Sequence, residues 1–198
     1  MIGNDAAAGQ EIMITMSIGI ILKNQKIFHE KIIIFYTQFT LALRDAMTNV
    51  GNKAAFTARV SDIRDNDEYG IVLMDANNLK MINDNFGHDA GDEYLKGCCE
   101  ILCDTFAHSP VFRIGGDEFA VILKGRDYTG RQELFKQIKE KFRTIWEEKK
   151  DDPVHRYSAA LGMADSTICD STRETIKTAD DAMYADKKKF KEENGSYR

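Results

Sequence analysis

Two short apolar runs joined by a Gly-Gly pair constrain this chain more than any other feature. Residues 111–114 and 119–123 are rich in Val, Ile, Leu and Phe, which favours two strands with the glycines of 115–116 between them. The pattern therefore predicts a β-hairpin, whose tip can come close to a ligand because glycine lacks a side chain. Asp117 and Glu118 follow at once. Adjacent carboxylates suit a hard cation such as Mg²⁺, although the same residues also suit an ordinary polar turn.

A second group of polar residues follows another apolar run. Residues 71–74 suit a buried strand, which Asp75 ends. The Asn pair at 77–78 and Lys80 then fall where a helix is expected to start, and the free N–H groups of a helix start favour an anion. Asp75 alone could be a helix-capping aspartate. Together with the acidic hairpin, however, these residues indicate a site for a metal ion and a polyphosphate.

The rest of the chain alternates between helical and strand patterns. This order predicts an α/β fold of the α+β sandwich type, with helices flanking a central, mostly antiparallel sheet. Apolar residues make up 43% of the chain and charged residues 30%, as in a globular protein. The expected helices cover residues 54–63, 78–85, 89–106, 134–146 and 172–191, and a further strand is expected at 157–163.

Composition also excludes some partners. The net charge of −5 and the pI near 5.4 argue against a nucleic-acid-binding surface. The apolar run at 12–22 is too short to span a bilayer, and no signal peptide is evident. We therefore expect a cytoplasmic location, with no insertion of this chain into a membrane.

The first forty-four residues form a separate segment, so residues 1–44 and 45–198 are expected to be two domains. Apolar residues alternate over 12–20, which favours a strand. A heptad-like seam then predicts a helix that runs into Asp45. This helix could pack on its own domain or could be a dimerising signalling helix, and both interpretations stay open. The seam consists of Phe28, Ile32, Phe35, Phe39, Ala42 and Ala46.

Six ordered motifs carry a resemblance that covers the chain from Asp45 onward. They are Asp45-Ala46-Met47-Thr48, Asn52-Lys53, Asp75 through Lys80, Asn83-Asp84 with Gly87 through Asp92, Gly115 through Phe119, and Ala179 through Tyr184. In this order and at these spacings the chain resembles the GGDEF-domain diguanylate cyclases. The resemblance implies a ferredoxin-like βαββαβ core, similar to the palm of nucleotidyl cyclases and polymerases.

The resemblance also implies an activity. Two GTP molecules would condense to cyclic di-GMP and two pyrophosphates, in bacterial second-messenger signalling. Each subunit of a homodimer would hold one GTP, and each 3′-hydroxyl would attack the α-phosphate of the other. An upstream sensory region or partner would regulate the reaction.

The metal and catalytic residues follow from the same resemblance. Two Mg²⁺ or Mn²⁺ ions per site would be held by Asp75, the main-chain carbonyl of Ala76, Asp117 and Glu118. Either Asp117 or Glu118 could also help to deprotonate the attacking hydroxyl, and the sequence does not choose between these two catalytic residues.

Further residues are implied for the nucleotide. Asp92 would accept from the adjacent N1–H and 2-amino donors of guanine, which adenine lacks, and Asn83 would add a polar contact. Lys191 stands where the family often has an arginine after a glycine, and here Phe190 precedes it. The C-terminal lysines also suit a solvated helix end. The phosphate-binding residues would be Asn78, Leu79, Lys80, Gly115, Gly116, Lys187 and Lys191.

Two further expectations concern regulation. The family's product-inhibition motif is Arg-x-x-Asp, but residues 106–109 read Phe-Ala-His-Ser, so we expect no such allosteric site. A catalytically silent GTP-binding or regulatory interaction module is the alternative function. The three carboxylates at 75, 117 and 118 argue against it, because a binding module does not need them all.

Overall fold

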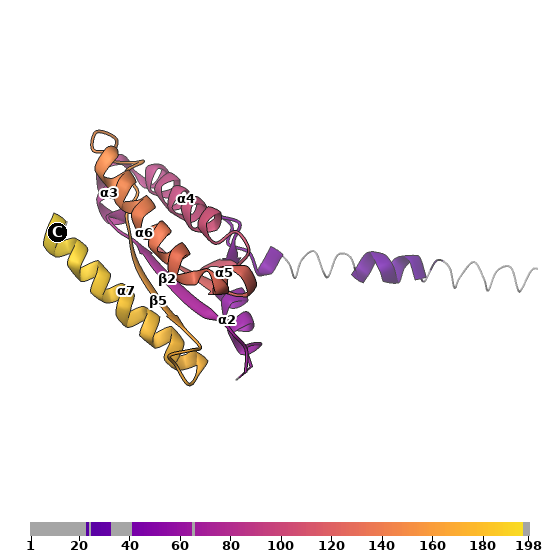
Figure 1. The fold of residues 1–198 in the computed structure, drawn as a ribbon. Helices are drawn as coiled ribbons and strands as arrows, with labels where there is room; N and C mark the ends of the chain where they lie inside the picture. Colours follow the sequence, from indigo (N-terminus) through magenta and orange to yellow (C-terminus); the bar gives the residue numbers. More distant parts are fainter. Residues whose placement is uncertain (1–22, 24, 33–40, 65, 196–198) are drawn as a thin grey trace, which may run out of the picture. The chain divides into compact units, whose positions relative to one another are not determined.

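The computed structural model describes residues 23, 25–32, 41–64 and 66–195 (Figure 1). The chain divides into two compact units, Met1–Ala42 and Leu43–Arg198. The larger unit holds all the strands that the structure describes, so the fold is that of this unit.

A five-stranded sheet forms the centre of the larger unit, with the strand order β1-β3-β4-β2-β5. Only the pairing of β1 with β3 is parallel, and the other three pairings are antiparallel. The expected mixed fold with a mostly antiparallel sheet is therefore confirmed. The strands are β1 (Gly51–Asn52), β2 (Gly70–Ala76), β3 (Val111–Arg113), β4 (Glu118–Leu123) and β5 (Ala159–Asp165).

Helices connect these strands in pairs. The order β2, α3, α4, β3, β4, α5, α6, β5 is a βαββαβ order in which each helical connection contains two helices. The expected helices are present with ends shifted by a few residues, whereas the two-residue β1 and the short α5 were not predicted. The helices are α2 (Lys53–Ser61), α3 (Leu79–Phe86), α4 (His88–Thr105), α5 (Gly125–Thr129), α6 (Arg131–Glu148) and α7 (Thr172–Asn194).

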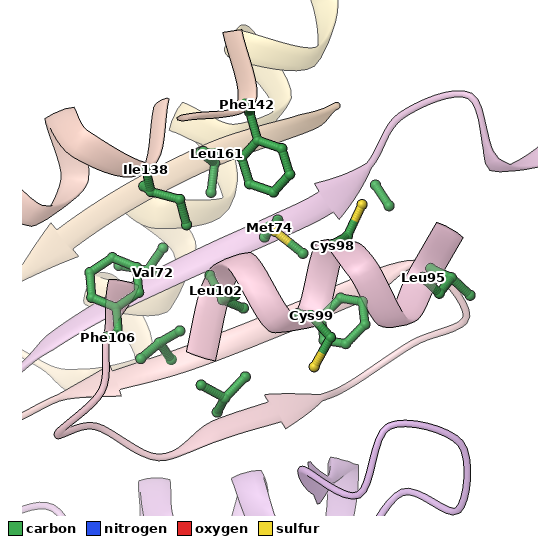
Figure 2. Packing of buried hydrophobic residues seen from close by; sticks show 14 of the residues in the cluster. Val72, Met74, Leu95, Cys98, Cys99, Leu102, Phe106, Ile138, Phe142 and Leu161 are labelled. Carbon is green, nitrogen blue, oxygen red and sulfur yellow. The ribbon is translucent and has the colours of Figure 1, made fainter. Parts of the chain in front are cut away.

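Alternate residues of β2 face the two sides of the sheet, since successive strand side chains point in opposite directions. Val72 and Met74 are fully buried against α4 and α6, as Figure 2 shows. Leu102 of α4 and Phe142 of α6 belong to the same cluster, so this side of the sheet is closed by an apolar layer.

The other side of the sheet is covered by α2 and α7. Ile71 and Leu73 pack there with Ala179 and Met183 of α7. Gly162 of β5 lets the helix come close, because a Cβ at this position would collide with the α7 backbone. Asp75 shares the strand parity of Ile71 and Leu73, and its side chain therefore lies on the α7 side.

The N-terminal prediction is wrong in one respect. The expected helix does not run into Asp45, since residues 43–50 form turns and an isolated bridge. The Asp45 carboxylate accepts hydrogen bonds from the Thr48 backbone N–H (2.9 Å) and hydroxyl (2.7 Å). Such side-chain bonds to nearby backbone favour a turn over a helix.

The other N-terminal expectations fall largely outside the described residues. Residues 25–32 are helical, and Phe28 of the seam is exposed. The expected strand at 12–20 lies outside the described residues, as do Phe35 and Phe39. Among the described helices, none is both long enough and apolar enough to cross a membrane.

Candidate functional site

Strand register brings the acidic residues of two distant segments together. In the antiparallel pairing of β2 with β4, Asp75 lies directly opposite Glu118. Opposite residues on paired strands have neighbouring side chains on one face. The pairing extends one residue beyond the start of β4, since the Ala76 N–H at the end of β2 donates to the Asp117 carbonyl at 2.9 Å. The end of β2 and the acidic hairpin therefore form one edge of the site.

The Gly-Gly pair lies in the turn between β3 and β4, as the sequence predicts. The N–H groups of Ile114 and Gly115 both donate to the Glu118 carbonyl, at 2.9 and 3.3 Å. A Cβ on Gly115 would collide with the Glu118 carboxylate, whereas a Cβ on Gly116 would meet no atom within 4 Å. A side chain at 115 would thus displace the carboxylate of Glu118, a functional side chain.

The side chain of Arg113 stabilises this turn, a role that the sequence did not indicate. Its Nε and Nη2 donate to the Gly116 carbonyl at 3.1 and 2.6 Å. Its Nη1 lies 3.3 Å from Oδ1 of Asp45, in the turn before β1. The available signal was a charged residue at the end of an apolar strand, separated from the glycines by Ile114 alone.

Asp75 is the buried carboxylate of the site, with 6% of the residue exposed. Lys187 of α7 donates to its Oδ2 at 2.6 Å. Its Oδ1 is buried and has no hydrogen-bond partner among the described residues. Burial raises the pKa of Asp75, the hydrogen bond from Lys187 offsets this only in part, and nearby Asp117 raises the pKa further. Asp75 does not cap a helix, because α3 begins after Asn78.

These oxygens fit a hard cation in their chemistry. Carboxylate and carbonyl oxygens are the ligands of Mg²⁺ and Mn²⁺, and the partnerless Oδ1 of Asp75 is the kind of atom such an ion satisfies. Within the described residues, however, no three acidic, His or Cys side chains converge closely enough to hold a metal ion. Asp75, Asp117 and Glu118 are therefore neighbours that do not form a closed cluster of three side chains.

Five of the seven expected phosphate-binding residues line one cavity of about 190 Å³. The start of α3 and the C-terminal part of α7 form its walls. Asn78 precedes α3 in the left-handed conformation (φ 62°), which Asn tolerates better than most residues. This cavity is lined by Asn78, Leu79, Lys80, Lys187 and Lys191, together with Ala76 and Asp117. Gly115 and Gly116 do not line it, so their phosphate contacts stay a prediction.

A second cavity, of about 490 Å³, contains the two expected guanine-binding residues. Asn83 of α3 and Asp92 of α4 both line it, and Leu79, Lys80 and Asp117 line both cavities. The absence of a side chain at Gly91 makes room for Asn83, since a Cβ there would collide with the Asn83 amide. The two cavities thus adjoin, as a base site and a polyphosphate site must.

Asn77 also lines the smaller cavity, but its side-chain amide bonds to a residue outside that cavity. It is buried, its side-chain amide donates to the Ser158 hydroxyl at 3.0 Å, and its N–H donates to the Ser158 carbonyl. An amide at this position joins the end of β2 to the segment before β5. The site therefore contains one carboxylate from this strand end, Asp75.

The segment at 106–109 offers no charged pair. Phe106 is buried in the core, and the His108 N–H donates to the Asp127 carboxylate at 3.0 Å. The expectation that product does not inhibit at this surface stays a prediction.

Comparisons with known proteins identify the family. Residues 42–193 match the family described as diguanylate cyclase, GGDEF domain. The probable diguanylate cyclase DgcI of Escherichia coli is 31% identical over 161 residues, which cover 77% of this chain and 33% of DgcI. The bifunctional diguanylate cyclase/cyclic di-GMP phosphodiesterase MucR of Pseudomonas aeruginosa is 29% identical over 151 residues, 73% of this chain and 22% of MucR.

The fold agrees with this assignment. The coiled coil and GGDEF domain of DgcB from Caulobacter crescentus, crystallised with c-di-GMP, superimposes with a TM-score of 0.68 at 19% identity. That match covers 87% of this chain and 95% of the crystallised DgcB chain. The chain spans about a fifth to a third of the length of its two relatives. By family match and fold together, the chain belongs to the GGDEF-domain diguanylate cyclase family.

Proposed function

We propose that this chain is an active diguanylate cyclase, which condenses two GTP into cyclic di-GMP and two pyrophosphates. The observation that supports the proposal most is the strand register that sets Asp75 opposite Glu118 and beside Asp117. Asp75 costs stability through its burial and its repulsion by Asp117, and a protein that only bound a nucleotide would have no need of all three carboxylates.

Binding in this proposal divides between the two adjoining cavities. Asp92 and Asn83 hold guanine, and the α3 start with Lys187 and Lys191 holds the phosphates. Asp92 selects guanine because only guanine presents two adjacent donors to a carboxylate. An adenine there would leave the acceptor without its partner, which is a strong penalty.

Catalysis then depends on positioning and charge. Two Mg²⁺ or Mn²⁺ ions, when bound by Asp75, Asp117, Glu118 and the Ala76 carbonyl, neutralise phosphate charge and favour ionisation of the attacking 3′-hydroxyl. Asp117 or Glu118 takes the hydroxyl proton. The protein's own contribution is to align the 3′-hydroxyl of one subunit's GTP with the α-phosphate of the other.

The ring cannot close within one subunit. Each site holds a single GTP, and two phosphodiester bonds have to form between two nucleotides. A homodimer is therefore part of the proposal, and residues 1–44, with an upstream sensory region or partner, would regulate how often the two sites meet.

Turnover of GTP with Mg²⁺ tests the proposal, with products resolved by mass. We expect cyclic di-GMP from the wild type and a loss of at least about 100-fold in Asp117→Ala with Glu118→Ala. The matched control is Glu192→Ala with Glu193→Ala, which removes two adjacent exposed carboxylates of α7 and should keep the wild-type rate. GTP binding without any turnover at high protein concentration would favour the silent module instead.

A further inference from the structure

We propose that Lys187 is an internal counterion for Asp75, which opposes metal binding until a triphosphate draws its ammonium away. Metal and nucleotide then bind this site cooperatively, and neither alone binds it well. The inference rests on the proposed function, because it assigns the order in which the ligands of that site are accepted.

The position of Lys187 carries the argument. Its ammonium lies 2.6 Å from Oδ2 of Asp75, across 112 positions of sequence. The pair is well enclosed, with 9% of the Asp75 side chain and 28% of the Lys187 side chain exposed. Lys187 also lines the cavity assigned to phosphate. One ammonium thus lies between a carboxylate expected to bind metal and the site expected to bind anions.

Two cations compete for this carboxylate. A divalent ion and an ammonium on the same oxygen exclude each other sterically. On opposite oxygens of one carboxylate they would still repel each other strongly, because both are partly shielded from water. Lys191, one helical turn further along α7, adds positive charge in the same direction. Metal binding to Asp75 is therefore favoured only if Lys187 leaves.

A triphosphate in the adjoining cavity would draw the Lys187 ammonium away from Asp75. Its oxygens offer Lys187 an anionic partner in the adjoining cavity, within reach of a side chain that is flexible and strongly hydrated. Transfer of the ammonium to phosphate frees Oδ2 for the metal, which in turn binds the phosphates.

Calorimetric titration of four proteins with Mn²⁺ alone tests whether Lys187 opposes metal binding, at a mildly alkaline pH that favours the ionised form of Asp75. Lys187→Met keeps the stem of the side chain and removes its charge, and we expect it to bind Mn²⁺ at least tenfold more tightly than wild type. Lys188→Met, an exposed neighbour on the same helix, is the matched control and should bind like wild type. The double variant Lys187→Met with Asp75→Asn should not show this tighter Mn²⁺ binding, which would locate the ion at Asp75.

Titration with GTP, first in EDTA and then with Mn²⁺, tests whether metal and nucleotide bind cooperatively. Wild type should bind GTP much more tightly when Mn²⁺ is present, and this enhancement should shrink at least tenfold in Lys187→Met. Unchanged or weaker Mn²⁺ binding in a folded Lys187→Met protein would overturn the proposal. If wild type bound no GTP, the proposed function would fail, yet the titrations with Mn²⁺ alone would still decide the role of Lys187.

Discussion

At the scale of single residues, the site places a carboxylate where it costs stability. The pKa of Asp75 is raised, first by burial, so its ionised form is less favourable in the folded chain than in the unfolded one. Ionised Asp75 therefore lowers the free energy of unfolding at pH values above its raised pKa. A residue that weakens the fold in this way is expected where function requires it.

Asp75→Asn should raise the stability of the fold and abolish its activity. The amide removes the buried charge, and the partly exposed Lys187 can turn to solvent. We expect Tm in EDTA at neutral pH to rise by about 2 °C or more, since 1 kcal/mol corresponds to roughly 2–4 °C in a domain of this size. Cyclase activity should be lost. A fall in Tm would show that the ion pair with Lys187 outweighs the burial of the charge.

Gly115→Ala should impair the site with little effect on the core. The new Cβ would collide with the Glu118 carboxylate, and a displacement of about 1 Å at a reacting group can cost around 100-fold in rate. Gly116→Ala is the matched variant, because its Cβ would meet nothing within 4 Å. We expect turnover in Gly115→Ala to fall well below that in Gly116→Ala, with similar Tm values. Equal rates would contradict the close approach as the reason for glycine.

Several residues of the site could be predicted from the sequence alone, and others could not. The motif order indicated Asp75, Asn83 and Asp92, and the structure places the last two in one cavity. Local sequence does not reveal that Arg113 pairs with Asp45 or that Lys187 binds Asp75. Each contact joins segments far apart in the chain, so it depends on tertiary packing.

At the scale of elements, the loop between α6 and β5 is tied to α4 through a titratable residue. The ring nitrogens of His155 lie 2.9 Å from the carboxylates of Asp152 and Glu93. These contacts raise the pKa of His155, with Asp152 the larger cause. Asp92, next to Glu93 on α4, lines the expected guanine cavity, so this tie lies beside the nucleotide site.

His155→Gln should flatten one part of the pH dependence of stability. Because the folded-state pKa is raised, the contribution is fully present below about pH 6.5 and is lost as pH rises through the raised value. Tm of wild type should therefore fall more between about pH 6 and pH 8.5 than Tm of the variant. The effect should be small, since 42% of the side chain is exposed.

The matched control is His108→Gln, at another exposed histidine, and its Tm should depend on pH as that of wild type does. Parallel profiles for wild type and His155→Gln would contradict this tie.

Long helices could be predicted from the sequence, whereas the shortest helix and strand could not. The helices at α4, α6 and α7 have clear apolar periodicity and were expected within a few residues of their observed ends. β1 has two residues and α5 has five, too few for any period to show. The expected helix into Asp45 failed because a local hydrogen bond, from Thr48 to Asp45, competes with helix formation.

At the scale of the whole molecule, the proposed activity requires two subunits to meet. If residues 1–42 promote this meeting, their removal should lower specific activity at low protein concentration and leave it similar at high concentration. The fragment 43–198 contains both apolar clusters and should unfold with nearly the wild-type Tm. Specific activity measured over a concentration series would check this. Activity independent of concentration in both proteins would argue against assembly through residues 1–42.

The stoichiometry of the reaction tests the central claim most directly. Purified protein would be incubated with GTP and Mg²⁺, and cyclic dinucleotide and pyrophosphate would be quantified in the same sample. An active diguanylate cyclase must release two pyrophosphates for each cyclic di-GMP formed. We predict this ratio of two to one, with no GDP accumulating. Release of GDP and phosphate, or pyrophosphate without cyclic di-GMP, would contradict the proposed chemistry of the site.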